Sequence, residues 1–153
     1  MIKWQWSSYN ELSQDEIYEI LKIRQAVFIV EQKCAYQDAD DLDSAAWHLM
    51  GWHENTNGNE LAAYVRVVFP GKKYPEPSIG RVLTSHLFRG TGLGKSLIIE
   101  AIAHIKLEYP DMHIRISAQK YLEKFYSSFG FKTVSDQYYE DGIPHIEMLK
   151  SDT

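Results

Sequence analysis

The 153-residue sequence has only one cysteine and no long apolar run. Cys34 has no partner for an internal disulfide, which agrees with a reducing compartment. No stretch approaches the roughly 20 apolar residues that a membrane-spanning helix needs. The first residues, Met-Ile-Lys-Trp-Gln-Trp, lack the hydrophobic region of a signal peptide. These absences predict a cytoplasmic protein that has no membrane partner.

Basic residues are scarce in the first part of the chain. Residues 1–60 contain 4 Lys and Arg against 11 Asp and Glu, whereas residues 61–153 contain 12 against 10. The net charge of −5 argues against nucleic acid as a partner, because nucleic-acid-binding domains usually carry a basic surface. The uneven distribution is either chance or the mark of one end that handles a cation and another that handles an anion.

The remaining composition predicts a single folded domain over residues 1–153, because 44% of the residues are hydrophobic and 13% are aromatic. Ser13 and Glu16 form a capping box that opens a helix, and Asn57-Gly58 and Asp141-Gly142 favour hairpin turns. We expect an α/β fold with a mixed sheet in the order β-α-β-β-β-α-β-α-β-β. The expected strands are 2–6, 46–54, 60–69, 78–84, 114–118, 131–139 and 143–149, and the expected helices are 14–31, 91–108 and 120–129.

A glycine-rich loop, residues 89–96, lies between an expected strand and an expected helix. Its three glycines allow backbone N–H groups to converge on an anion at the positive end of the helix. The Walker A pattern fails because Arg89 stands where its first glycine belongs, and the dinucleotide pattern fails at Lys95. A glycine-rich helix entry that serves packing alone is the simpler alternative.

The loop resembles the acetyl-CoA loop of the GNAT acetyltransferase superfamily, [Q/R]-x-x-G-x-[G/A], through Arg89, Gly92 and Gly94. The later segment Phe125-Tyr126-Ser-Ser-Phe-Gly130-Phe131 is similar to its second cofactor segment. Further stretches resemble the ElaA-like branch across nearly the whole chain: 30–32, 36–38, 80–82, 118–119 and 140–146. One departure is Ala118-Gln119, where the superfamily often has an asparagine. The resemblance implies the GNAT fold, with its fourth and fifth strands splayed apart.

The resemblance also implies the chemistry: direct transfer of an acetyl group from acetyl-CoA to a primary amine of a small-molecule or peptide acceptor. No metal is needed, and a homodimer is common in the superfamily. Tyr126 is the implied proton donor to sulfur, with an ordinary phenol pKa of about 10 that exceeds that of a thiol. The residues implied to hold the cofactor are Val82, Leu83, Thr84, Arg89, Gly90, Thr91, Gly92, Leu93, Gly94 and Lys95.

The general base has three candidates: Glu31 near the end of the first helix, His48 and His145. Histidine titrates near neutrality, and His145 shares a strand face with Glu147, which could orient it. Arg81 is a candidate for binding an acceptor carboxylate, and a surface salt bridge is its simpler role.

The acidic segment 38–43 does not fit a calcium loop, because Leu42 and Asp43 stand where an EF-hand requires Asp or Asn and then Gly. In the GNAT fold this segment borders the acceptor pocket, where it would attract a cationic amine. Two alternatives to an acetyltransferase remain. One is a non-catalytic acyl-CoA-binding or regulatory module on the same fold, and the other is a P-loop nucleotide hydrolase, which Arg89 disfavours.

Overall fold

The computed structural model describes residues 1–152. The strands are β1 (Ile2–Ser8), β2 (Ala46–Asn55), β3 (Gly58–Val68), β4 (Ser78–Thr84), β5 (Ile114–Gln119), β6 (Phe131–Thr133), β7 (Tyr138–Glu140) and β8 (Ile143–Lys150). The helices are α1 (Gln14–Arg24), α2 (Leu93–Glu108) and α3 (Glu123–Ser127). Within this part of the chain, no helix is both long and apolar enough to cross a bilayer.

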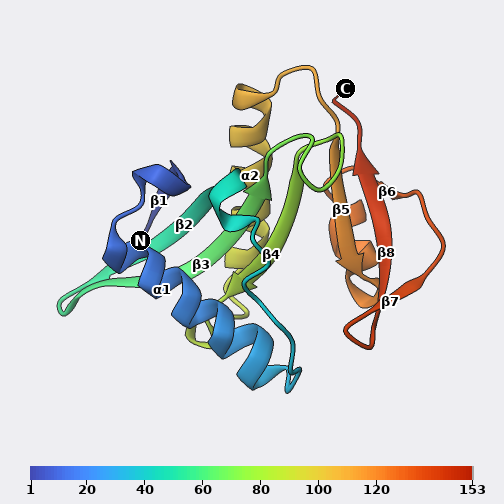
Figure 1. The fold of residues 1–153 in the computed structure, drawn as a ribbon. Coiled ribbons are helices and arrows are strands. Elements are labelled where there is room, and N and C mark those ends of the chain that lie inside the picture. The colour runs from blue at the N-terminus through green and yellow to red at the C-terminus, as the bar shows by residue number, and fades with distance from the viewer. Residues whose placement is uncertain (153) are drawn as a thin grey trace.

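One mixed sheet organises the fold, in the strand order β1-β2-β3-β4-β5-β8-β6, with β7 also paired to β8. All neighbours are antiparallel except β4 and β5, which are parallel and share the single pair Ser78–Arg115. Figure 1 shows that the two strands then diverge, so that β1–β4 and β5–β8 form two halves of the sheet. The predicted mixed sheet with splayed fourth and fifth strands is confirmed.

The helices cover both faces of the sheet, with α1 in front of β3 and β4 in Figure 1 and α2 behind them. The larger core joins buried residues of α2, such as Leu97 and Ile98, to the sheet and to Tyr126 of α3. The smaller core packs Ile20 of α1 and Val27 against β2, β3 and β4. Each helix therefore fixes one face of β4, the strand that borders the gap.

The first helix starts as its capping box predicts. The Glu16 N–H donates to Ser13 Oγ at 3.1 Å, and the Ser13 N–H donates to Glu16 Oε1 at 2.8 Å. The predicted helix over 14–31 is α-helical only to Arg24 and continues as a π-helix over Gln25–Glu31. This second part contains β-branched residues, which lower helix propensity and agree with a loosened turn.

The predicted strand 131–139 is two strands, β6 and β7, separated by residues 134–137. Both pair with β8, but the register between them shifts, because this side of the hairpin holds extra residues. In the gap, the Glu147 N–H donates to the Ser135 hydroxyl at 2.8 Å in place of a strand carbonyl. The turn at Asp141-Gly142 has φ values of 51° and 76°, as predicted for this dipeptide.

Candidate functional site

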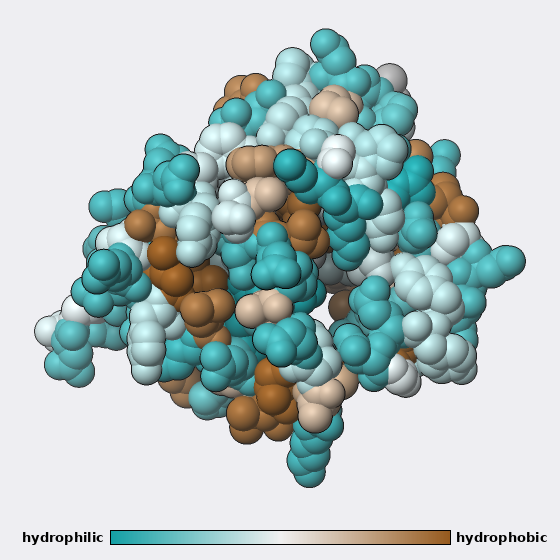
Figure 2. Space-filling model, viewed as in Figure 1, coloured by the Kyte–Doolittle hydropathy of each residue, from teal (hydrophilic) through white to brown (hydrophobic). Residues whose placement is uncertain are grey.

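A pocket lies where β4 and β5 separate. Its volume is about 130 Å³, and Figure 2 shows the same face hollowed between the two halves of the sheet, with hydrophilic residues on much of the rim. Beyond the Ser78–Arg115 pair, β4 has no partner strand on this side. The register of β3 and β4 also shifts between Tyr64 and Arg66, and Arg81 adopts a φ of 52° there. This bulge turns β4 away from β5 and leaves backbone groups of β4 free to bind an extended ligand.

The glycine loop forms the N-terminus of α2 beside the end of β4. Gly90 and Gly92 have φ values of 80° and 82°, and Gly92 is the N-cap of the helix. A side chain built on either glycine would meet no atom within 4 Å, so the backbone conformation requires glycine here and packing does not. The outer side of the loop is open, and the first N–H groups of α2 have no acceptor within the helix. The loop therefore suits an anion, as its sequence predicts.

Arg89 connects this loop to two other segments. Its Nη1 lies 2.8 Å from Glu31 Oε2, and its Nη2 donates to the Thr84 carbonyl oxygen at 3.1 Å. Glu31 is thus paired with the first residue of the glycine loop and does not line the pocket. The structure places this candidate base beside the glycine loop and outside the pocket lining.

Tyr126 of α3 lines the pocket, as its predicted role requires. The residue is 6% exposed, and its ring packs edge-on against Phe125 and Phe131. Burial raises the pKa of its hydroxyl above the ordinary value, so the group is protonated at neutral pH. Within residues 1–152, the hydroxyl has no hydrogen-bond partner, which leaves it available to a ligand in the pocket.

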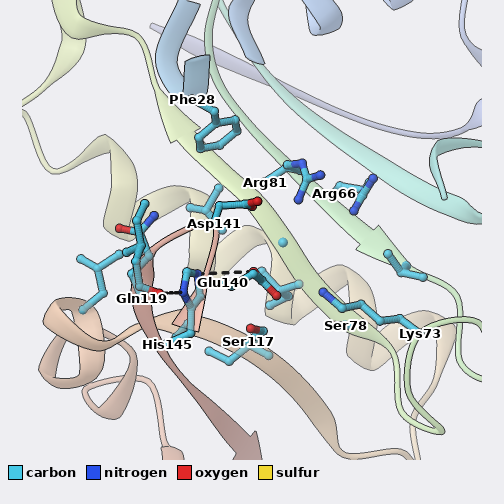
Figure 3. Close-up of a pocket in the computed structure, with 18 of the residues that line it drawn as sticks. Phe28, Arg66, Lys73, Ser78, Arg81, Ser117, Gln119, Glu140, Asp141 and His145 are labelled. Atoms are coloured by element: carbon cyan, nitrogen blue, oxygen red, sulfur yellow. Dashed lines mark hydrogen bonds and ion pairs between the residues drawn. The ribbon is translucent and has the colours of Figure 1, made fainter. Parts of the chain in front are cut away.

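His145 also lines the pocket and is held by its own hairpin (Figure 3). Its Nδ1 lies 2.7 Å from the Ile143 carbonyl oxygen, which can only accept, so Nδ1 carries the proton. The other ring nitrogen, Nε2, lies 3.5 Å from Glu140 Oε2. The predicted orienting residue, Glu147, instead pairs with Arg115 at 3.0 Å, because it belongs to the ion pairs at the far end of β5.

The pairing of His145 with Glu140 has a chemical consequence. With Nδ1 protonated, the Nε2 of a neutral imidazole and the Glu140 carboxylate are both acceptors and face each other. A hydrogen-bond donor between them, such as an ammonium group or a water molecule, can donate to both acceptors. If Nε2 itself takes up a proton, it becomes the donor to the Glu140 carboxylate. The arrangement is suited to removing a proton from a bound amine.

His48, the third candidate base, is buried away from the pocket. It is 1% exposed, its Nε2 lies 2.9 Å from the Asp43 carbonyl oxygen and its Nδ1 lies 2.6 Å from the Tyr64 hydroxyl. Since the carbonyl oxygen can only accept, Nε2 donates to it and Nδ1 accepts the tyrosine proton. Burial also lowers the pKa of His48, which favours the neutral ring. The structure gives His48 a structural role.

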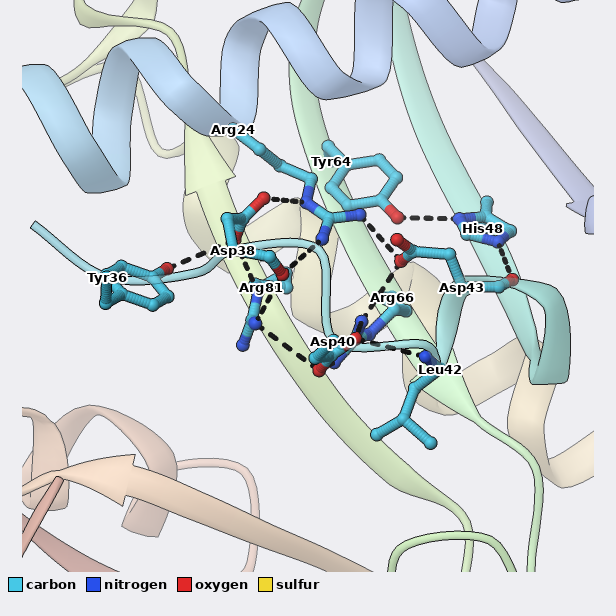
Figure 4. Close-up of polar contacts among 10 residues, drawn as sticks. All are labelled: Arg24, Tyr36, Asp38, Asp40, Leu42, Asp43, His48, Tyr64, Arg66 and Arg81. Atoms are coloured by element: carbon cyan, nitrogen blue, oxygen red, sulfur yellow. Dashed lines mark hydrogen bonds and ion pairs between the residues drawn. The ribbon is translucent and has the colours of Figure 1, made fainter. Parts of the chain in front are cut away.

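The acidic segment folds onto three arginines and forms the network in Figure 4. Arg24, which is 0% exposed, binds Asp38 at 2.9 Å and Asp43 at 2.7 Å. Arg66 binds Asp40 at 2.7 Å and Asp43 at 3.0 Å. These carboxylates are neutralised within the fold, so they do not form the free acidic rim that the sequence suggests.

Arg81 also belongs to this network. Its Nε donates to Asp38 Oδ1 at 2.8 Å, and its Nη2 donates to the Asp38 carbonyl oxygen at 3.0 Å. Arg81 lines the pocket, but Asp38 and Asp40 already neutralise its charge. The side chain anchors the loop after α1 to the bulge in β4.

Sequence reasoning missed two parts of the site. Glu140 contacts His145 because β7 pairs with β8, which the spacing along one strand could not indicate. Arg66 interrupts the apolar run of β3. Because a buried charge needs partners, this arginine could have indicated a buried network of ion pairs.

Comparisons with known proteins agree with this architecture. The chain is 47% identical over 148 residues to a UPF0039 protein of Synechocystis, covering 97% of this chain and 94% of the relative. It is 40% identical over 152 residues to the protein ElaA of Escherichia coli, covering 98% and 97% of the two chains. These similarities confirm the resemblance to the ElaA-like branch.

Solved structures show the same fold. The crystal structure of an acyl-CoA N-acyltransferase from Pseudomonas aeruginosa superposes with a TM-score of 0.92 at 37% identity, covering 99% of this chain and all of the other. The crystal structure of Escherichia coli ElaA superposes with a TM-score of 0.90 at 38% identity, with the same coverage. The family model for the acetyltransferase (GNAT) domain matches residues 16–151, and the chain therefore belongs to the GNAT acetyltransferase family.

Proposed function

We propose that the protein is an acetyl-CoA-dependent N-acetyltransferase that transfers the acetyl group directly to a primary amine of a small-molecule or peptide acceptor. The observation that carries this proposal is the pocket between β4 and β5. It brings together the unpaired side of β4, the hydroxyl of Tyr126 and the His145–Glu140 pair. Family membership supports acyl transfer in general, and this arrangement supports amine acetylation in particular.

The residues present fit acetyl-CoA at two places. The glycine-rich start of α2 suits a pyrophosphate, because the first N–H groups of the helix have no acceptor within it and the side-chain position of Gly92 is open. The unpaired side of β4 suits the amide groups of a pantetheine arm, which could add to the strand as a peptide would. Arg89 is the first residue of this loop and places a guanidinium group at it, which Glu31 pairs with in this structure.

Acetyl-CoA, when bound, supplies the thioester whose acetyl group is transferred. The His145–Glu140 pair would accept the proton of the amine, which makes the nitrogen a nucleophile. The backbone N–H of Val82, in the bulge that lines the pocket, would stabilise the charge that develops on oxygen. Leu83, the other predicted candidate, pairs with Tyr64 of β3 and does not line the pocket. Each of these groups sits on a strand, so its position is fixed before the ligands arrive.

Tyr126 would act on the departing sulfur. Its raised pKa keeps the proton on the hydroxyl, but it also makes the phenol a weaker acid than a thiol, whose ordinary pKa is about 8.5. Full proton transfer to the thiolate therefore costs free energy. A hydrogen bond to sulfur that strengthens as negative charge develops is the contribution that a buried hydroxyl makes most readily.

The test is a calorimetric titration with acetyl-CoA, combined with an assay of thiol release over a panel of primary amines. Gly92→Ala places a side chain on a left-handed residue, and we expect it to weaken acetyl-CoA binding by about tenfold or more, because the strain displaces the loop. Gly58→Ala is the matched control: Gly58 has a φ of 110° and open space around it, but it lies in the β2–β3 hairpin.

Three outcomes decide the proposal. Binding that Gly92→Ala weakens and Gly58→Ala does not, together with amine-dependent thiol release, supports it. Binding without thiol release from any amine favours a non-catalytic acyl-CoA-binding module. No binding of acetyl-CoA overturns the proposal.

A further inference from the structure

The charges that line the pocket are not all neutralised by the fold. The arginine–aspartate network contains three cations and three anions that pair with one another: Arg24, Arg66, Arg81, Asp38, Asp40 and Asp43. Outside this network, the charged side chains on the pocket wall are Lys73, Glu140 and Asp141. These three decide which charges a ligand in the pocket must carry.

Lys73 stands on the loop between β3 and β4. The loop is held by a tight turn in which the Gly71 N–H donates to the Tyr74 carbonyl oxygen at 2.7 Å, and the ammonium lies 5.5 Å from the centre of the Tyr74 ring. In Figure 3 the ammonium points from the loop toward the pocket. In residues 1–152, no carboxylate forms an ion pair with it, although the charge of Glu140 acts on it across the pocket, so the pocket contains a cation that no ion pair neutralises.

Two further features support an anion at this point. The Ser78 side chain is buried beside Lys73 at the start of β4, and no hydrogen bond of its hydroxyl is seen in the part of the chain that the structure describes. The pKa of Lys73 is lowered, first by partial desolvation and also by the Arg66 and Arg81 guanidinium groups, although Glu140 opposes the shift. A bound anion would satisfy the hydroxyl and stabilise the ammonium form.

The opposite wall carries the complementary charge. Glu140 lies beside His145 and faces the Lys73 side across the pocket in Figure 3, but the two do not form an ion pair with each other. The space between them therefore has the Glu140 carboxylate, beside His145, at one end. At the other end are the Lys73 ammonium and the Ser78 hydroxyl. A ligand with one positive and one negative group matches both walls.

We propose that the acceptor is an amine that also carries a carboxylate, with the amine at the His145–Glu140 pair and the carboxylate at Lys73 and Ser78. This inference rests on the proposed function and adds the substrate class. A diamine would place its second cation beside Lys73 and is disfavoured by like-charge repulsion. An uncharged alkylamine would leave Lys73 without a counter-ion.

The test compares amines that differ only in the carboxylate: β-alanine with propylamine, 4-aminobutyrate with butylamine, and lysine with cadaverine. We expect kcat/KM, measured by thiol release, to be about tenfold or more higher for the carboxylate member, the effect of one charge-assisted hydrogen bond. Lys73→Gln should reduce this ratio to near one without changing the KM for acetyl-CoA. Lys72→Gln is the matched control, because Lys72 is exposed like Lys73 but does not line the pocket.

The results separate this inference from the proposed function. Equal or better turnover of the decarboxylated amines, or a preference that Lys73→Gln leaves intact, overturns the inference while acetylation itself stands. If no amine supports thiol release, the proposed function fails. The inference is then tested by calorimetry, which measures the binding of each amine to the protein saturated with coenzyme A. Tighter binding of β-alanine than of propylamine, lost in Lys73→Gln, then supports it, and equal binding overturns it.

Discussion

Asp38→Asn tests whether the buried network holds the acceptor side of the pocket together. The carboxylate of Asp38 contacts Arg24 Nε at 2.9 Å, Arg81 Nε at 2.8 Å and the Tyr36 hydroxyl at 3.1 Å. The amide keeps the shape of the side chain but removes the charge that serves two arginines, one of them fully buried. Because Arg24 and Arg81 then lie close together with less negative charge between them, the variant should be markedly less stable.

The size of the effect follows from the contacts that remain. Breaking a buried ion pair costs about 3–5 kcal/mol, and since Asp43 still binds Arg24 and Asp40 still binds Arg81, we expect about 3 kcal/mol. For a domain of this size, such a loss lowers Tm by about 6–12 °C. Urea unfolding at constant m-value gives the free energy, and thermal unfolding gives Tm.

Asp41→Asn is the matched control, three residues away. Asp41 is exposed and has a φ of 67°, a conformation that asparagine tolerates, so the change should stay within about 0.5 kcal/mol. If Asp38→Asn cost no more than Asp41→Asn, the network would not stabilise the fold, and the loop after α1 would need another anchor. A normal Tm combined with a raised acceptor KM would refute the stability argument in the same way.

Two further predictions concern protonation and the leaving group. The pKa of Asp40 is lowered, since the hydrogen bond and charge of Arg66 outweigh the effect of burial. The ionised Asp40 side chain therefore stabilises the fold at pH values above about 3.9, the ordinary pKa of an aspartate in the unfolded chain. This stabilisation is lost as the pH falls below that value. Between about pH 5 and about pH 2, Asp40→Asn should therefore lose less unfolding free energy than the wild type in urea titrations, and an equal loss would contradict this. Tyr126→Phe should lower kcat by about tenfold or more with little change in acetyl-CoA affinity, whereas Tyr121→Phe, which alters an exposed tyrosine, should change neither; an unaltered kcat would remove Tyr126 from the reaction.

Local signals in the sequence predicted the elements well. The capping box at Ser13 and Glu16 forms as expected, and Asp141-Gly142 makes its turn, because both depend on neighbours within a few residues. The π-helix after Arg24 was not predicted, since a loosened turn keeps the apolar side chains near the same face. The break between β6 and β7 depends on a hydroxyl that replaces a backbone carbonyl, a contact that no periodicity reveals.

The site divides in the same way. The glycine loop and Tyr126 lie in contiguous motifs, which made both recognisable; the structure places Tyr126 in the pocket wall and the loop at the start of α2, outside the pocket lining. The roles of Glu31, His48 and Arg81 depend on partners distant in the sequence, so their positions were open until the topology was known. The sequence did not single out Lys73, because lysines are common in loops. Only the structure shows that its ammonium lines the pocket without an ion pair in the described residues.

The gap between β4 and β5 also bears on how the protein avoids unwanted association. A strand with unpaired backbone groups normally invites other chains to add to it and is a risk for aggregation. Here the open side of β4 faces the interior of a pocket of about 130 Å³, and β5 and β8 stand in front of it. Only a slender, extended molecule can reach those groups. The fold thus leaves backbone groups of β4 unpaired and able to bind a ligand, while the rest of the sheet keeps neighbouring proteins from pairing with them.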